Sequence, residues 1–154
     1  MRRIVIASLC LLAAISFTSS AAFADDMAKL EANKKTVAEF YDAVLNKKDY
    51  ELALTYIGEA GYTQHNPGAK DGVEGMKGFI GFLKSKYPDN HSEIKRIFAE
   101  GDYVITHVHA VREPGTRGNA IVDIFRLDDK GKVVEHWDAV QPIPEEAMND
   151  NTMF

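Results

Sequence analysis

The protein is a chain of 154 residues with a formal net charge of −5 at pH 7, and 45% of its residues are hydrophobic. This length fits one domain built around a single core. The sequence has no clustered basic stretch, and an acidic chain of this kind is a poor candidate for binding nucleic acid or an anionic membrane.

Residues 1–24 have the three parts of a secretory signal peptide. Two arginines precede an apolar run, and small residues close the segment at Ala24. The apolar run is too short and wrongly flanked for a membrane span. Cys10, the chain's one cysteine, lies within it. We therefore expect cleavage after Ala24, no membrane association afterwards, and a cysteine-free mature domain, residues 25–154, in the periplasm or outside the cell.

Three segments of the mature chain have apolar residues at helical spacing. The pattern predicts helices over residues 26–46 and 49–57, and a third that Asp71 caps and that ends before Pro88. Three glycines recur at every third position of this last helix: Gly75, Gly78 and Gly81. Each weakens a helix by about 1 kcal/mol relative to alanine, so we expect close packing against another backbone as the compensation.

A loop with a fixed turn separates the second and third helices. The sequence YTQHNPGAKDG covers residues 62–72. Pro67 restricts the backbone of Asn66 before it, and Gly68 permits the positive φ of a turn. In one interpretation the turn presents His65 and Asn66 to a pocket. In the other, His65 is exposed to solvent and Asn66 only caps the turn.

Alternating apolar residues predict four strands in the second half of the chain. One covers residues 92–99, and three more lie within residues 101–141, joined by turns at Pro114-Gly115 and at residues 129–131. Assigning odd positions of the first two strands in that stretch to one face puts several proton-handling residues together. They are His107, His109, Asp123, His136 and Asp138.

The last turn decides how the final two strands pair. A four-residue loop places Asp123 opposite His136 and Ile121 opposite Asp138, whereas a three-residue loop places Asp123 opposite Trp137. We favour the four-residue loop because it keeps Asp123, His136 and Asp138 together and does not scatter polar groups over an apolar sheet.

Asp138 is the strongest candidate for chemistry, because a carboxylate between Trp137 and Val140 should be desolvated and able to carry a proton near neutral pH. The alternative is a structural aspartate paired with an arginine. Two histidines spaced as in His107-x-His109 also suit a metal, and with Asp123 they would give zinc three ligands. We favour a site without metal, in which these histidines are satisfied by hydrogen bonds.

Both faces of the predicted sheet are apolar, and the helices of one chain can cover only one of them. The even face carries Val104, Val108, Ala110, Val122 and Ile124. We therefore expect a homodimer packed through the sheet.

The run VDIFRLDDKGKVVEHWDAVQPIPE, with YTQHNP at 62–67 and the ending NTMF, resembles the SnoaL-like proteins of the nuclear transport factor 2-like superfamily. The resemblance covers about the whole mature chain. It implies an α+β cone, in which a curved mixed sheet wraps around helices and encloses a pocket. It also implies aldol chemistry without metal or cofactor, with a carboxylate at Asp138 and pocket positions at Asp123 and Asn66. Cyclases of this family are similar except that they have histidine where this chain has Asp123.

Two functions follow from these features. The first is an enzyme, of cyclase, lyase or isomerase type, that performs cofactor-free acid and base chemistry on a small apolar or aromatic carbonyl compound. The second is a non-catalytic periplasmic homodimer that binds such a compound. In the first, the catalytic residues are Asp138, Asp123 and His136, and the substrate-binding residues are His65, Asn66, His107 and His109.

Overall fold

The computed structural model describes residues 24–154. The predicted signal peptide, residues 1–24, therefore lies outside the described residues except for its last position. Within the described range, no helix is long and apolar enough to cross a membrane.

The helices lie close to where the sequence predicts them. The first covers residues 24–41 and continues into a π-helical turn, η1 (Asp42–Asn46). The second, α2 (Tyr50–Leu54), is capped by Asp49, whose carboxylate accepts a hydrogen bond from the Leu52 N–H at 3.0 Å. It is shorter than predicted, because the chain turns at Thr55 and Ile57 bridges to Val133 of the sheet. The third, α3 (Gly72–Lys86), has the predicted Asp71 cap.

The strands form one mixed sheet. They are β1 (Thr63–Gln64), β2 (His91–Glu100), β3 (Tyr103–Val111), β4 (Asn119–Leu127) and β5 (Val133–Pro142). Their order is β1-β5-β4-β3-β2, with β1 parallel to β5 and the other pairs antiparallel. The four predicted strands are confirmed. The short strand β1, at the start of the predicted 62–72 loop, was not expected.

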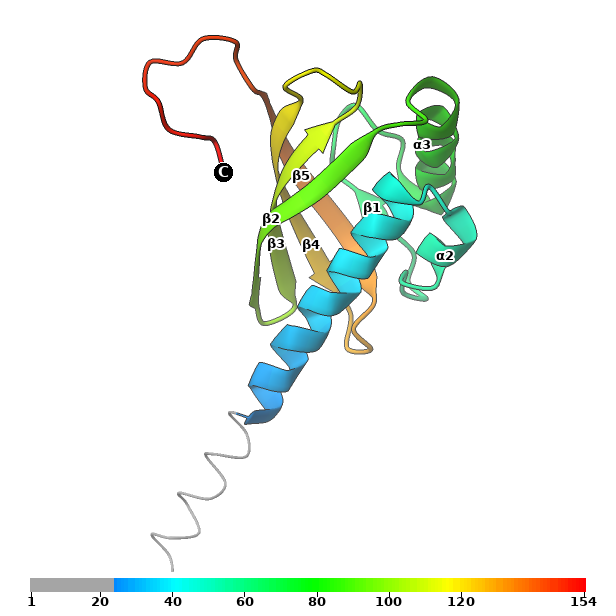
Figure 1. The fold of residues 1–154 in the computed structure, drawn as a ribbon. Coiled ribbons are helices and arrows are strands. Elements are labelled where there is room, and N and C mark those ends of the chain that lie inside the picture. The colour runs from blue at the N-terminus through cyan, green and yellow to red at the C-terminus, as the bar shows by residue number, and fades with distance from the viewer. Residues whose placement is uncertain (1–23) are drawn as a thin grey trace, which may run out of the picture.

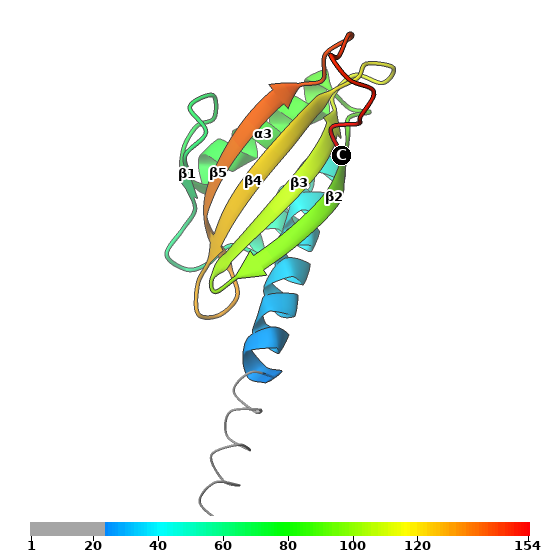
Figure 2. The same cartoon turned by 90° about the vertical axis from the view of Figure 1, so that its left-hand side faces the viewer.

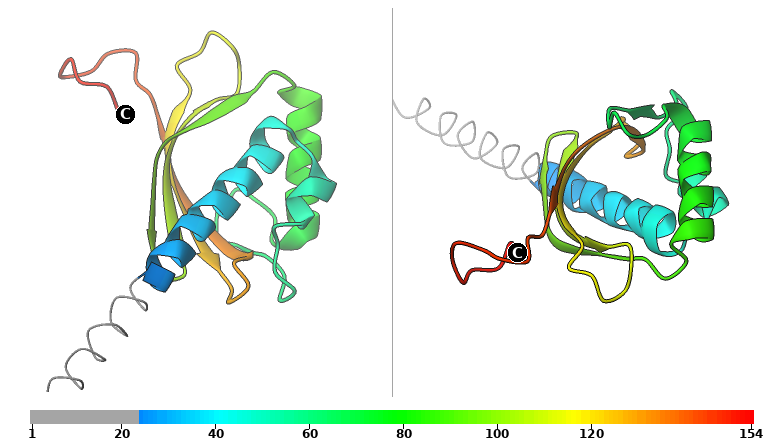
Figure 3. Two further views of the ribbon diagram at one scale, coloured as in Figure 1. Left: turned by 60° about the horizontal axis from the view of Figure 1, so that its bottom comes forward. Right: turned by 90° about the horizontal axis from the view of Figure 1, so that it is seen from above.

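The sheet curves around the first helix, and α3 crosses the open side of the curve (Figures 1 and 3). This arrangement confirms the predicted α+β class. The core lies between the inner face of the sheet and the helices, where Val37, Phe40, Val108, Phe125 and Leu127 are buried. Figure 2 shows the opposite, outer face of the sheet, which no helix of the described chain covers. The C-terminal segment turns back from the end of β5 toward this outer face.

The predicted pairing of β4 with β5 is wrong by two residues. Asp123 lies opposite Asp138, not His136, and Ile121 lies opposite Val140. The connection contains five residues, 128–132, and the register shifts at a bulge between Arg126 and Leu127. A shift of two residues preserves the face of each side chain, so Asp123, His136 and Asp138 still share one face.

The prediction that odd positions of β3 and β4 share a face is also wrong. Asp123 pairs with Thr106, and Val122 pairs with His107. Even positions of β3 therefore face the core together with odd positions of β4. His107 and His109 lie on the outer face, on the other side of the sheet from Asp123. The cause is the length of the β3–β4 connection, which sets this parity and which strand alternation alone does not reveal.

Two glycines of α3 should respond in opposite ways to alanine. A Cβ at Gly75 would collide with the carbonyl oxygen of Lys70, whereas a Cβ at Gly78 would meet no atom within 4 Å. The expected close packing is thus found at Gly75 but not at Gly78 or Gly81. We expect Gly78→Ala to raise the free energy of unfolding by up to about 1 kcal/mol and Gly75→Ala to lower it. Urea unfolding of the two variants measures this difference, and the reverse order of stability would contradict it.

Candidate active site

A cavity of about 730 Å³ lies between the inner face of the sheet and the helices. This volume suits a small organic ligand. The first helix and α3 supply much of its apolar wall, including Phe40, Tyr41, Val44, Met76 and Phe79. Polar side chains from β1, the loop after it, β4 and β5 gather on one side of the cavity. They are Gln64, Asn66, Asp123, His136 and Asp138.

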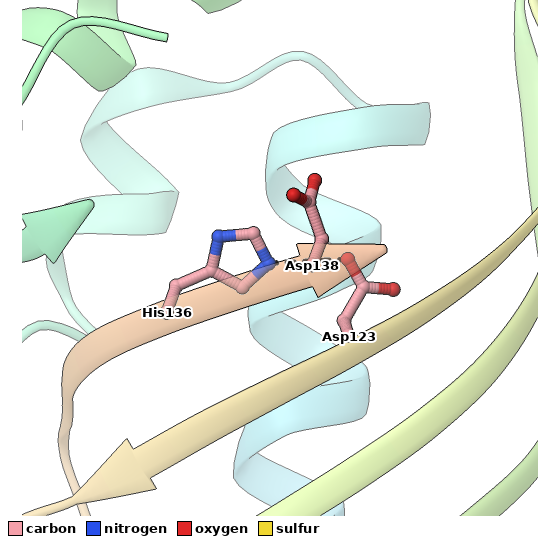
Figure 4. Close-up of side chains that lie close together, drawn as sticks. All are labelled: Asp123, His136 and Asp138. Atoms are coloured by element: carbon pink, nitrogen blue, oxygen red, sulfur yellow. Dashed lines mark hydrogen bonds and ion pairs between the residues drawn. The ribbon is translucent and has the colours of Figure 1, made fainter. Parts of the chain in front are cut away.

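The three predicted catalytic residues all line this cavity, and Figure 4 shows that their side chains lie close together. Asp123 on β4 faces Asp138 on β5, and His136 precedes Asp138 by two positions on the same strand and face. Ligand atoms of all three residues lie within 4.8 Å of one another. Asp123 and His136 are buried, and Asp138 is half-buried.

Asn66 holds Asp138 in place. Its side-chain Nδ2 donates to both carboxylate oxygens of Asp138, at 2.7 and 2.8 Å. The Asn66 Oδ1 accepts the backbone N–H of Gly68 at 2.7 Å, so the amide is oriented with its nitrogen toward Asp138. Both interpretations of Asn66 therefore hold, because the residue fixes the turn and also lines the pocket.

Asp123 belongs to a second chain of hydrogen bonds. One carboxylate oxygen, Oδ1, lies 3.1 Å from His136 Nε2. The other, Oδ2, accepts a hydrogen bond from the Thr106 hydroxyl at 3.1 Å. The other ring nitrogen, His136 Nδ1, lies 3.0 Å from Gln64 Oε1, which also accepts the backbone N–H of Asn66. Because Gln64 Oε1 is an acceptor, Nδ1 carries a proton. The contact between Nε2 and Asp123 then needs one further proton, which the imidazole and the carboxylate share.

Burial raises the pKa of Asp123 above its usual range, and the hydrogen bond and charge of His136 oppose this effect. Burial also raises the pKa of Tyr41 and of Tyr62, and the negative charge of Asp123 adds to both shifts. The two phenols therefore stay protonated at neutral pH and can donate hydrogen bonds into the cavity. The ring of Tyr62 lies nearly parallel to that of His136, with centroids 6.5 Å apart.

Three predicted substrate-binding histidines do not line this cavity. His65 stacks on Trp137 with ring centroids 4.6 Å apart, and its Nε2 lies 2.8 Å from Glu135. His107 and His109 lie on the outer face, where both rings contact Phe154 at centroid distances of 5.2 and 4.8 Å. These placements correct the predicted pocket positions. They also exclude a zinc site made by His107, His109 and Asp123.

A different trio, Asp123, His136 and Asp138, is compact enough to surround one ion. Each of its possible ligand atoms already has a hydrogen-bond partner, from Asn66, Thr106, Gln64 or within the trio. An ion bound there would have to displace some of these hydrogen bonds.

Sequence reasoning missed three residues that support the cluster, Gln64, Thr106 and Tyr62. Gln64 and Thr106 bond to it directly, and Tyr41 and Tyr62 line the cavity beside it. Tyr41 is 5% exposed, and it both packs in the core and lines the cavity. The one available signal was the spacing of Gln64 and Asn66, which differ by two positions as His136 and Asp138 do.

Several solved structures share this fold. A putative polyketide cyclase from Bacillus cereus is 21% identical, with 71% of this chain and 74% of that chain covered and a TM-score of 0.59. A SnoaL-like protein of unknown function from Burkholderia thailandensis is 18% identical, with 72% of this chain and 96% of that chain covered and a TM-score of 0.60. A nuclear transport factor 2-like protein of unknown function from Cytophaga hutchinsonii is 18% identical, with 71% of this chain and 90% of that chain covered and a TM-score of 0.58. A comparison with curated proteins gave no match.

The curved sheet, the helices inside it and these neighbours define a nuclear transport factor 2-like fold. A model of the SnoaL-like domain matches residues 37–136, well over half of the chain. The protein belongs to the SnoaL-like domain family. The match includes Asn66, Asp123 and His136 and ends two residues before Asp138.

Asp123 should make stability depend on pH in a defined direction. An unfolded aspartate titrates near pH 3.9, and the folded one titrates at higher pH, so between the two values the folded state binds more protons and the free energy of unfolding falls as pH rises. Asp123→Asn removes this titration. We expect the stability of the variant relative to wild type to increase as the pH is raised from about 4 to 6.

Urea unfolding across that pH range measures the effect. Asp89→Asn, which removes an exposed carboxylate outside the cavity, controls for the loss of one negative charge. A stability difference between wild type and Asp123→Asn that stays constant with pH would contradict the expectation.

Proposed function

We propose that the protein catalyses cofactor-free acid and base chemistry on a small carbonyl compound, with Asp138 as the base that removes a proton α to the carbonyl. One observation supports this most directly. Asp138 is a half-buried carboxylate that reaches an apolar cavity and is fixed there by the oriented amide of Asn66. A positioned carboxylate of this kind can take a proton without the cost of reorganising its surroundings.

The two aspartates are suited to different roles. Asp123 is buried, shares a proton with His136, and has both oxygens engaged by His136 and Thr106. Asp138 lines the cavity, and its two oxygens accept hydrogen bonds from the neutral amide of Asn66. A pair of neighbouring carboxyl groups in different environments is the usual basis for separating an acid from a base. Asp138 is thus the base, and Asp123 with His136 holds the proton.

The proton balance of the step follows from these roles. The C–H bond α to the carbonyl breaks, its proton goes to Asp138, and its electron pair becomes the enolate. The phenols of Tyr41 and Tyr62 are neutral donors in the same cavity, suited to hydrogen-bonding the enolate oxygen. Return of the proton from Asp138 to another carbon would complete an isomerisation. Attack of the enolate on a second carbonyl would form the new C–C bond of an aldol condensation, and the resulting alkoxide would take the proton back from Asp138.

A non-catalytic role is the second candidate, and one observation favours it. The Asn66 amide contacts both oxygens of Asp138, so the carboxylate is satisfied without a substrate. In that case the cavity binds a small apolar or aromatic carbonyl compound and the polar cluster only orients it.

Asp138→Asn separates the two candidates. For carbonyl compounds that stabilise the protein in thermal-shift screening of aryl ketones and β-keto esters, we expect wild type to accelerate exchange of the α-proton for deuterium, as followed by NMR. We expect the variant to lose roughly 10²- to 10⁴-fold of this rate while its affinity changes little, the usual cost of losing a general base. Asp129→Asn, on the exposed β4–β5 turn, is the matched control. Binding without accelerated exchange in wild type would favour the binding protein.

We also propose that two copies of the chain pair through the outer face of the sheet. Four side chains form a row there, one from each of β2 to β5: Phe98, Ile105, Ile124 and Trp137. Phe98 is 57% exposed and Ile105 is 39% exposed, which leaves apolar surface in water.

Sedimentation tests this pairing. We expect the mature protein to be a dimer at micromolar concentration and Ile105→Glu to be a folded monomer, because a charge in a dry interface costs several kcal/mol unless it is paired. Glu93→Gln is the control. Glu93 pairs with His109 at one end of the outer face, and the substitution adds neither an apolar nor a charged group. A monomeric wild type would refute the proposal.

A further inference from the structure

A positive charge lies at one end of the cavity, next to the last residues of β3. Arg112 follows β3 directly and lines the cavity together with Asn119 at the start of β4. Its guanidinium carbon lies 5.7 Å from the ring centre of Phe79 and 5.8 Å from that of Tyr87, so aromatic side chains of α3 and its C-cap flank it. No acidic side chain of residues 24–154 forms a salt bridge with Arg112.

The charge of Arg112 is felt inside the cavity. Burial and the two aspartates raise the pKa of Tyr41, and Arg112 acts in the opposite sense. The phenol of Tyr41 is therefore under the influence of both the carboxylates of the polar cluster and the guanidinium of Arg112. The cavity thus has negative charge at Asp138, a cation near its rim, and apolar wall between them.

This distribution of charge selects among substrates. A guanidinium with no acidic partner in the described chain, flanked by aromatic rings, is suited to bind a carboxylate through two parallel hydrogen bonds. The same carboxylate would be repelled at the other side of the cavity, where Asp138 lies. A ligand with one carboxylate and an apolar body therefore has one favourable orientation, with its charged end at Arg112.

We propose that the substrate of this site is an apolar or aromatic carbonyl compound that also carries a carboxylate, and that Arg112 binds this carboxylate. The assignment rests on the proposed function for the identity of the reacting group. It adds the substrate class and a specificity-determining residue. Phe79 contacts the body of the substrate, and the carbonyl end lies toward Asp138. Gly78 leaves open space beside this path, since a Cβ there would meet no atom within 4 Å.

A matched pair of probes tests the assignment. 2-Naphthylacetate and 2-naphthylacetamide have the same apolar body, and only the first is charged at neutral pH. We expect isothermal titration of the mature protein to show the acid binding at least about tenfold more tightly than the amide, the effect of one charge-assisted hydrogen bond. In Arg112→Gln the ratio should fall to about one, while the affinity for the amide stays unchanged and so reports an intact cavity.

Arg117→Gln is the matched control, because Arg117 is an exposed arginine on the same β3–β4 connection and does not line the cavity. It should keep the wild-type ratio. Equal affinity of wild type for the two probes, persistence of the ratio in Arg112→Gln, or failure of both probes to bind would each overturn the proposal.

The result is independent of the test of catalysis. Asp138→Asn should keep the preference for the acid or strengthen it, because it removes a negative charge from the far side of the cavity. A preserved preference in a protein that does not accelerate proton exchange would refute the proposed reaction and leave the Arg112 subsite standing. Accelerated exchange without any preference for the acid would support the proposed reaction and refute the Arg112 subsite.

Discussion

The short parallel pairing of β1 with β5 is the constraint on which the site depends. Gln64 pairs with His136, and the His65 N–H donates to the His136 carbonyl at 2.9 Å. Side chains two positions apart in neighbouring strands point the same way, so Gln64 and Asn66 follow His136 and Asp138 along the inner face. The turn at residues 66–68 then orients the Asn66 amide. This pairing and the side-chain hydrogen bonds of Gln64 and Asn66 together fix the loop relative to His136 and Asp138.

The same arrangement explains how two carboxylates are tolerated side by side on an inner face. Asp123 and Asp138 are direct cross-strand partners, and like charges in that position repel each other. The repulsion is reduced because Asp123 shares a proton with His136, and Asp138 has an amide donor on both oxygens. The hydrogen-bond partners thus separate the two groups chemically, although the strands place them together.

Local pattern was sufficient to predict the helices, the four long strands and the grouping of Asp123, His136 and Asp138. It was not sufficient wherever the outcome depended on counting residues through a turn. The five-residue connection and the bulge beside Arg126 each moved the β4–β5 register by one residue, and the total shift of two left the cluster intact. The β3–β4 connection set the opposite parity from the one assumed, which moved His107 and His109 to the other face. Strand β1 has only two residues, too few for alternation to be visible.

The displaced histidines show what the outer face does with its polar groups. His107 and His109 lie beside Phe154, and His109 Nε2 also contacts the Arg117 carbonyl at 2.8 Å. The C-terminal segment therefore packs against its own sheet at the end that carries these histidines (Figure 2). The apolar row that begins with Phe98 and Ile105 lies beyond it. One end of the outer face is thus occupied by the chain itself, which restricts any contact with a second copy to the other end.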